Sequence, residues 1–246
     1  MTALFALLLL PGAAAGAAPS QPPAAVQTAP GPGEPVNAAV YRRADELFAH
    51  RDRAGAPDEA RALLEKTLAA SPLDAGLLWR YGRARVITGE HARGWGRAEH
   101  FVEAEQALLA AIDIDPDLLD ARYWLATARY DRGHYKQALA ALDEALKLAP
   151  DDARLHRLAG DVRWHAPRLF GGDRRLAVQE YQKALALSPR FAEDYVSLAE
   201  AYADLGLPDE AVAVLDRMDK QTDLAPPGLA GPYRDRALSL RRRLSR

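Results

Sequence analysis

Apolar positions along most of the chain recur with the spacing of an amphipathic helix, and one kind of helical segment returns four times, each time ending in a proline. The segments are ARALLEKTLAASP, AEQALLAAIDIDP, ALAALDEALKLAP and AVQEYQKALALSP, and their last residues are Pro72, Pro116, Pro150 and Pro189. Successive prolines are 44, 34 and 39 residues apart. A return at this interval predicts a repeat protein, in which each unit buries its apolar face against the next.

Alignment on the prolines places a small residue and, four positions later, a large residue at equivalent sites of each repeat. A small residue lets two helices approach closely, and a large residue one turn later fills the remaining space. The small residues are Ala60, Ala104, Ala138, Ala177 and Ala211, and the large ones are Leu64, Leu108, Leu142, Tyr181 and Leu215. The preceding helices carry matching large-small pairs at Tyr81-Gly82, Leu125-Ala126, Ala159-Gly160 and Leu198-Ala199. The pattern predicts helix hairpins.

These residues resemble the tetratricopeptide repeat family over about Tyr41 to Lys220, in five repeats, most closely in FAEDYVSLAEAYADLGLPDEAVAVLDRM. The resemblance implies an all-α fold, a right-handed α-solenoid of helix hairpins with a concave groove. The repeats are expected within residues 37–222. Residues 223–246 are expected to form a loop and a C-terminal capping helix, in which Leu238, Leu240 and Leu244 cover the last open face.

The N-terminal residues predict export. Residues 1–18 contain an apolar run from Ala3 to Leu10, which is too short to span a bilayer, followed by small residues typical of a signal-peptide cleavage site. The run lacks a preceding lysine or arginine, which is a departure from the usual pattern. Residues 19–36 are rich in proline and alanine and predict a linker. A periplasmic or otherwise exported protein is expected, and a cytoplasmic one if residues 1–18 are not a signal peptide.

The composition argues against catalysis and cofactors. The chain has no cysteine, its six histidines show no metal-ligand spacing, and no GxSxG motif is present. Neither an enzyme, a cofactor nor a metal is therefore expected. A formal net charge of −2 gives no reason to expect a nucleic-acid partner, and no stable membrane insertion is expected.

Two repeats are longer than the others, and the extra residues fall in the turn inside a hairpin. They are EHARGWGRAEH, between Gly89 and Phe101, and HAPRLFGG in the fourth repeat. In the second of these, Pro167 is expected to end a helix, Gly171 and Gly172 permit a positive φ, and Asp173 is placed to cap the next helix.

The long turns have two interpretations. In the first interpretation they are longer turns with no function of their own. In the second they form rim loops whose aromatic and arginine side chains bind a partner. The rim residues are Trp95, Arg97, Arg168 and Phe170. The PxLxGGD pattern from Pro167 to Asp173 also resembles exported bacterial tetratricopeptide proteins, including the periplasmic component that accompanies TRAP-type transporters.

The family resemblance assigns the concave surface to particular positions of each first helix. Aromatic rings there would offer contact area, Arg157 would bind a carboxylate, and Asp161 would orient Arg157. Alternatively, Trp79, Tyr123 and Trp164 pack between neighbouring repeats. The predicted groove residues are Trp79, Arg83, Tyr123, Thr127, Tyr130, Arg157, Asp161 and Trp164.

Two functions follow from the resemblance. The first is a non-enzymatic scaffold that binds a protein or peptide in its groove, with the rim loops adding contacts. The alternative is a small-molecule-binding accessory component of a TRAP-type transport system, whose ligand would be a small apolar acid. An open trough favours the first function, and an enclosed pocket favours the second.

Overall fold

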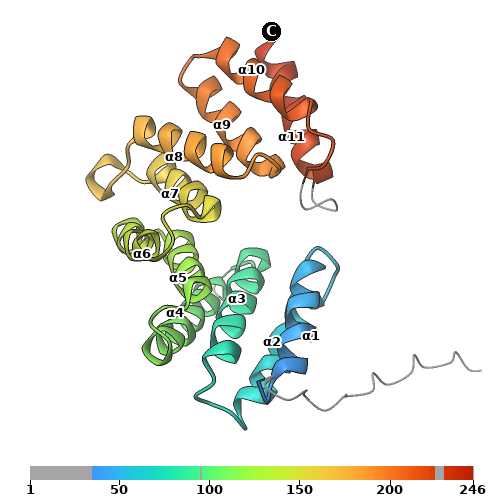
Figure 1. The fold of residues 1–246 in the computed structure, drawn as a ribbon, viewed down its shortest axis with the longest axis vertical. Coiled ribbons are helices and arrows are strands. Elements are labelled where there is room, and N and C mark those ends of the chain that lie inside the picture. The colour runs from blue at the N-terminus through green and yellow to red at the C-terminus, as the bar shows by residue number, and fades with distance from the viewer. Residues whose placement is uncertain (1–34, 95, 225–229, 246) are drawn as a thin grey trace, which may run out of the picture.

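The structure is a computed structural model that describes residues 35–94, 96–224 and 230–245. Regular secondary structure in these ranges consists of helices, which pair into five consecutive hairpins followed by one more helix (Figure 1). The hairpins are α1 (Ala38–Ala49) with α2 (Ala56–Leu68), α3 (Ala75–His91) with α4 (Gly96–Ile114), α5 (Leu119–Asp131) with α6 (Tyr135–Leu148), α7 (Ala153–His165) with α8 (Arg174–Leu187), and α9 (Ala192–Asp204) with α10 (Pro208–Asp219). The last helix is α11 (Ala230–Leu244).

The hairpins stack into a curved array, the right-handed solenoid that the family resemblance implies. In Figure 1 the array has the shape of a C, with α1 at one end of the open side and α11 at the other. The first helices α3, α5, α7 and α9 lie toward the inside of the curve, and α4, α6 and α8 lie on its outer side. The inner face is therefore built by the first helix of each repeat.

The aligned small and large residues form the contact between the two helices of each hairpin. All ten of them are buried, from Ala60 at 5% exposed to Leu215 at 0%. The fit is tight, because a β-carbon added to Gly82 of α3 would lie 2.5 Å from Cγ of Leu108 in α4. The hairpin register predicted from the prolines is confirmed.

The insertion in the second repeat does not form the predicted rim loop, apart from a short turn. Helix α3 continues to His91 and α4 begins at Gly96, so most of EHARGWGRAEH is helical. The two helices have 17 and 19 residues, against 13 and 14 for α5 and α6. The extra residues lengthen both helices because no proline interrupts them and Phe101 is buried at 1% exposure.

The insertion in the fourth repeat forms a true loop. Helix α7 ends at His165, one 3₁₀ turn spans Arg168–Phe170, and Gly171 has a φ of 97°. The Asp173 carboxylate accepts hydrogen bonds from the backbone N–H groups of Arg175 and Leu176 at 2.9 and 3.1 Å, which confirms the predicted cap. Gly172 is needed for space rather than for a positive φ, because a β-carbon there would lie 1.8 Å from the Ala166 carbonyl oxygen.

Helix α11 covers the end of the last hairpin, as predicted, but with a different apolar face. Ala237 and Leu240 are 3% and 4% exposed, and Leu244 packs against the same cluster. Leu238 is 55% exposed, so its assignment to the covering face was wrong. The reason is geometric, since positions 237, 240 and 244 share one helix face and position 238 lies about 100° away from Ala237.

Candidate functional site

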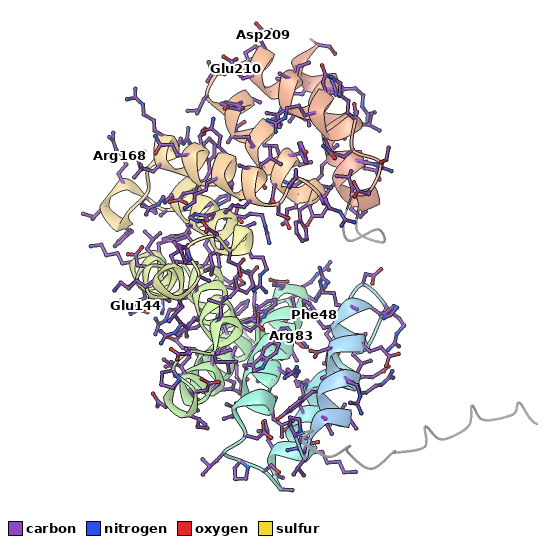
Figure 2. All side chains as sticks on the ribbon, in the orientation of Figure 1. Phe48, Arg83, Glu144, Arg168, Asp209 and Glu210 are labelled. Atoms are coloured by element: carbon purple, nitrogen blue, oxygen red, sulfur yellow. The ribbon has the colours of Figure 1, made fainter. Side chains whose placement is uncertain are left out.

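The N-terminal half of the inner face carries a row of alternating aromatic rings and guanidinium groups, here called the arginine–aromatic stack. Its members are Tyr41, Phe48, Trp79, Arg80 and Arg83. Arg80 Cζ lies 4.4 Å from the ring centroids of both Tyr41 and Trp79. Arg83 Cζ lies 4.8 Å from the centroid of Trp79 and 4.2 Å from that of Phe48, and Figure 2 shows Phe48 beside Arg83.

One carboxylate, that of Asp45 in α1, binds both arginines of the stack. Asp45 Oδ2 accepts a hydrogen bond of 2.8 Å from Arg80 Nη2, and Oδ1 accepts one of 2.7 Å from Arg83 Nη2. Burial acts to raise the pKa of Asp45, but the hydrogen bonds from Arg80 and Arg83 outweigh it and hold the pKa below its usual range. Two guanidinium groups therefore share one carboxylate, and a second carboxylate, that of Asp74, lies at the edge of the stack, where it accepts hydrogen bonds from the Tyr41 hydroxyl and the Asn37 amide.

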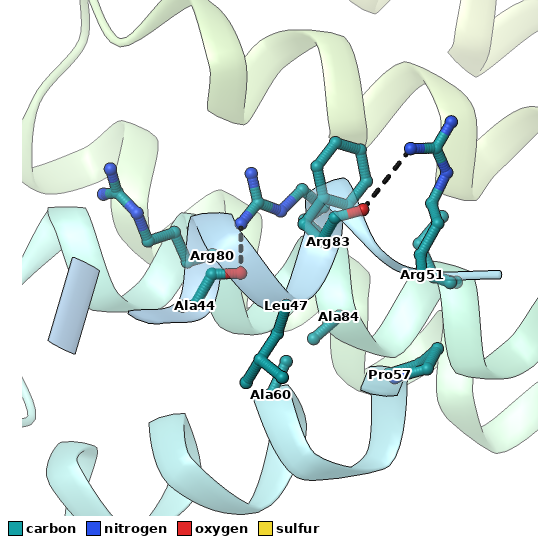
Figure 3. A pocket seen from close by; sticks show the side chains of 10 residues that line it. Ala44, Leu47, Arg51, Pro57, Ala60, Arg80, Arg83 and Ala84 are labelled. Carbon is teal, nitrogen blue, oxygen red and sulfur yellow. Dashed lines mark hydrogen bonds between the residues drawn. The ribbon is translucent and has the colours of Figure 1, made fainter. Parts of the chain in front are cut away.

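The space under the stack, between α1, α2 and α3, is too small for an organic ligand. This crevice encloses about 10 Å³ and is lined by Leu47, Phe48, Arg83 and seven further residues (Figure 3). Hydrogen bonds join Arg83 to the Ala44 carbonyl and Arg51 to the Phe48 carbonyl across it. A volume of this size is about that of one water-sized probe.

The centre of the inner face holds a second group of side chains, here called the Arg157 cluster. Its members are Tyr123, Arg157, Asp161, Glu193 and Asp194. Arg157 Nη1 lies 2.9 Å from Glu193 Oε2, and Arg157 Nε lies 3.2 Å from Asp194 Oδ1. Asp161, which the sequence suggested as the partner of Arg157, accepts a 2.8 Å hydrogen bond from the Tyr181 hydroxyl. The ion pairs of Arg157 thus join the fourth repeat to the fifth.

Burial changes the acidity of two carboxyl groups in the Arg157 cluster. It raises the pKa of Asp161 to about 6 and that of Asp194 to about 7, although Arg157 acts to lower both. Asp194 is 1% exposed, and its Oδ1 faces Arg157 without an aligned hydrogen bond. Both carboxyl groups are therefore poised to change charge near neutral pH.

The other predicted groove residues divide into buried and half-buried ones. Trp79 is 8% exposed because the two arginines cover its ring, and Thr127 is 8% exposed, with its hydroxyl donating to the Tyr123 carbonyl at 3.0 Å. Tyr123, Tyr130 and Trp164 are half-buried. These three rings, rather than Trp79, are the aromatic surface that a ligand can reach.

The half-buried rings are each held by a neighbour. Tyr123 packs edge-to-face on Trp124, with ring centroids 5.2 Å apart. The Tyr130 hydroxyl lies 2.9 Å from Nδ1 of His165, and Arg174 Cζ lies 5.0 Å from the Trp164 centroid. The rings are therefore fixed in place before any ligand arrives.

The predicted rim residues do not come together. Trp95 lies outside the described residues. Arg97 is exposed at the start of α4, and its Cζ lies 5.4 Å from the Phe101 centroid. Arg168 and Phe170 are exposed on the α7–α8 loop, where Lys136 Nζ lies 5.6 Å from the Phe170 centroid.

Four residues of the stack region were missed by sequence reasoning. Tyr41, Asp45 and Phe48 lie in the first helix of the first repeat, whose match to the repeat pattern is the weakest. Arg80 occupies a position next to Trp79 that the family pattern does not assign to the groove. The one available signal was the spacing of Tyr41 and Phe48, which are seven residues apart and so share a helix face.

Metal binding and membrane insertion both depend on features that can be checked in the described residues. Residues 35–94, 96–224 and 230–245 contain no group of three or more histidine, aspartate or glutamate side chains arranged to hold a metal ion. The helices in the same ranges include none that is long and apolar enough to cross a membrane.

Comparison with known proteins relates this geometry to other sequences. Residues 97–162 and residues 168–226 each match a family model described as tetratricopeptide repeat. The cellulose synthase operon protein C of Xanthomonas axonopodis pv. citri (strain 306) is 30% identical over 205 residues, which cover 76% of this chain. The matched part is 13% of that protein, so the chain spans a small fraction of this relative.

Solved structures of similar shape contain the same kind of repeat. TTC0263, a thermophilic TPR protein in Thermus thermophilus, has a TM-score of 0.63 and 26% identity, covering 82% of this chain and 97% of its own. MamA from Desulfovibrio magneticus RS-1, residue 41 to the end, has a TM-score of 0.53 and 19% identity, covering 74% of this chain and 97% of its own. The likeness to MamA concerns the fold alone.

Proposed function

Because the chain belongs to the tetratricopeptide repeat family, we propose that it is a non-enzymatic scaffold that binds an extended segment of a partner protein on its inner face. The observation that carries this proposal is the run of side chains from the arginine–aromatic stack to Tyr123, Tyr130 and Trp164. Fixed aromatic rings beside arginines provide contact area at low entropic cost, which is typical of binding surfaces.

The guanidinium groups of the stack indicate the chemistry of the bound segment. Arg80 and Arg83 share the carboxylate of Asp45, and Arg80, the more exposed of the two at 14% against 7%, would also bind a carboxylate of the partner, from an acidic side chain or a chain terminus. Arg157 is already paired with Glu193 and Asp194 and is not expected to bind the ligand directly. Its role would be to hold the fourth and fifth repeats in register beneath the ligand.

A site-specific photo-crosslink tests this function. A photoreactive phenylalanine analogue would replace Tyr123 or Tyr130 on the inner face and, as a control, Leu109, which is 39% exposed on α4. The expected result is a crosslinked product of defined mass from Tyr123 and Tyr130 in cells that express the full chain, and none from Leu109. Products from Leu109 alone, or from none of the three positions, would refute a binding surface on the inner face.

A small-molecule function receives no support from the crevice beneath the stack, which has room for one water molecule. The half-buried rings Tyr123, Tyr130 and Trp164 do not line it. We therefore do not propose the accessory role in a transport system that the sequence left open.

We also propose that the protein is exported, on the strength of residues 1–18. The test is N-terminal sequencing of the mature protein after separation of periplasm from cytoplasm. Export predicts a periplasmic protein whose first residue follows Ala15 or Ala18. A full-length protein that stays in the cytoplasm would refute it.

A further inference from the structure

The α7–α8 loop combines exposed apolar side chains with unpaired positive charge at the outer margin of the solenoid. Leu169 is 76% exposed, and Phe170 and Leu176 are 44% and 40% exposed. Figure 2 shows Arg168 on this loop, pointing away from the body of the molecule. Leu169 and Phe170 are adjacent in the chain, so the loop presents two exposed apolar side chains together rather than one isolated side chain.

The loop is held rigidly in its projecting conformation. The backbone N–H groups of Phe170 and Gly172 both donate to the Pro167 carbonyl, at 2.8 and 3.1 Å, and the Asp173 N–H donates to the Arg163 carbonyl at 3.0 Å. Gly171 adopts a positive φ beside Leu139 of α6. Leu169 and Phe170 are therefore presented to solvent by a fixed turn.

Positive charge surrounds these apolar side chains. The exposed cations are Lys136, Arg168, Arg174 and Arg175. The one acidic residue between positions 166 and 176 is Asp173, whose carboxylate is occupied by the N-terminus of α8. Within residues 96–224, no ion pair joins any of these four cations to a carboxylate. The local charge is thus positive although the whole chain carries −2.

We propose that the α7–α8 loop is a contact site for an anionic lipid bilayer. Leu169 and Phe170 enter the headgroup region. Arg168, Arg175 and Lys136, which lies beside Phe170, bind lipid phosphate groups, and Arg174 stays on the ring of Trp164. Basic residues near an anionic bilayer and apolar side chains that reach the acyl boundary together give reversible peripheral binding. A protein partner fits less well, because stable interfaces bury about 800 Å² on each side and two apolar side chains offer far less.

Peripheral binding through this loop leaves the proposed ligand surface free. The stack and the half-buried rings lie on the inner face, and the loop projects outside the curve beside α8 (Figure 1). The inference is independent of the proposed scaffold function, because binding of lipid vesicles is measured without any protein partner.

Vesicle binding by the full chain tests the proposal. Co-sedimentation would use vesicles of phosphatidylcholine alone and vesicles with a third of phosphatidylglycerol, at low and high salt. The expected result is salt-sensitive binding to the anionic vesicles only. Residues 1–36 contain no lysine or arginine, so they cannot supply the dependence on anionic lipid.

Paired variants separate the loop from other parts of the surface. Leu169→Ser with Phe170→Ser is expected to reduce partitioning into anionic vesicles at least tenfold. Leu73→Ser, at an equally exposed leucine before Asp74, is expected to leave the partitioning unchanged.

Arg168→Gln with Arg175→Gln is likewise expected to reduce binding. Arg242→Gln with Arg243→Gln, a matched pair on the basic face of α11, is expected to leave binding unchanged. Equal losses from the control variants would overturn the proposal.

A fluorescent label reports where the loop lies. Since the chain has no cysteine, Phe170→Cys provides a single attachment point for an environment-sensitive dye, with Leu73→Cys as its control. Anionic vesicles are expected to shift the emission of the Phe170→Cys label to shorter wavelength and to leave the Leu73→Cys label unchanged. A label at residue 170 that responds to poly-L-glutamate but not to vesicles would assign the loop to an acidic protein and overturn the lipid proposal.

Discussion

The Tyr181 ring of α8 occupies the space that Gly160 of α7 leaves open. A β-carbon added to Gly160 would lie 2.5 Å from Cε1 of the ring, which is 2% exposed at the centre of the hairpin. The third and fifth repeats pair Ala126 with Leu142 and Ala199 with Leu215 at the same sites. The fourth repeat therefore has a larger residue in the second helix and a smaller one in the first.

This relationship predicts that Gly160→Ala destabilises the protein. The added methyl group cannot be accommodated without moving the ring, and overpacking of this kind costs about 1 to 3 kcal/mol. Urea denaturation followed by circular dichroism measures the change. Gly160→Ala combined with Tyr181→Leu recreates the alanine–leucine pair of the third and fifth repeats. Gly160→Ala should therefore cost less in a Tyr181→Leu background than in the parent chain, a comparison in which the lost hydrogen bond from Tyr181 to Asp161 cancels. An equal cost in both backgrounds would contradict the packing argument.

The hairpin register was predictable because it depends on residues close together in sequence. Ala177 and Tyr181 are one turn apart in α8, and the proline after each second helix marks the same point of the repeat, so the alignment needed no tertiary information. The alternating layers of the solenoid follow from that register.

The charge pairing on the inner face was not predictable in the same way. Arg83 pairs with Asp45, 38 residues earlier, and Arg157 with Glu193, 36 residues later. Such pairs depend on how far each hairpin rotates relative to the next, which residue spacing does not determine. Arg157 therefore looked available for a ligand when it is occupied by neighbouring carboxylates.

The conformation of the insertion in the second repeat was also misjudged, for a physical reason. The residues from Gly89 to Phe101 contain glycines and a tryptophan, which are compatible with a loop, but nothing in them prevents helix formation before Ala92. Phe101 is 1% exposed, and its burial fixes the position of the first turns of α4, which begins at Gly96. Tertiary packing decided between two locally acceptable conformations.

Arginines of the fourth repeat should differ sharply in their contribution to stability. Arg157→Gln leaves Glu193 and Asp194 without their cation in a site where Asp194 is 1% exposed, and the loss of one partner of a buried pair costs about 3 kcal/mol. Arg154→Gln breaks pairs with Asp120 and Asp152, but the side chain is 42% exposed and the cost should be below about 1 kcal/mol. Equal losses in urea denaturation would contradict the assignment of Arg157 as the joint between the repeats.

The α7–α8 loop should depend on the absence of a side chain at Gly172. Gly172→Ala would place a β-carbon 1.8 Å from the Ala166 carbonyl oxygen, so the turn must open and a loss of about 2 kcal/mol or more is expected. Gly96→Ala is the matched control, because nothing lies within 4 Å of a β-carbon there and its backbone φ is not positive. Thermal denaturation compares the two variants. If Gly172→Ala has the same thermal denaturation midpoint as the parent chain, the loop is not held as described.

The stability of the protein should fall as the pH rises toward and through neutrality, with Asp194 as one identifiable cause. Burial raises the pKa of Asp194 from its usual value of 3.8 to about 7 in the folded chain, so its neutral form is favoured by folding. The stability that this group contributes is complete below about pH 4, declines as the pH rises, and is lost once the pH has passed 7, a loss of roughly 4 kcal/mol.

Asp194→Asn removes this titration and leaves Glu193 to pair with Arg157, so the variant should match the parent chain near pH 4 and exceed its stability at pH 8. Glu90 and Asp131, whose pKa values burial raises to about 7 and about 6, titrate in both proteins, and Asp161 does so as well, although its negative charge contributes to the raised pKa of Asp194. Asp143→Asn, at an exposed carboxylate of α6, is the control and should follow the parent chain at every pH. Urea midpoints measured from pH 4 to pH 8 test the prediction, and a constant difference between Asp194→Asn and the parent chain would show that Asp194 does not change charge in this range.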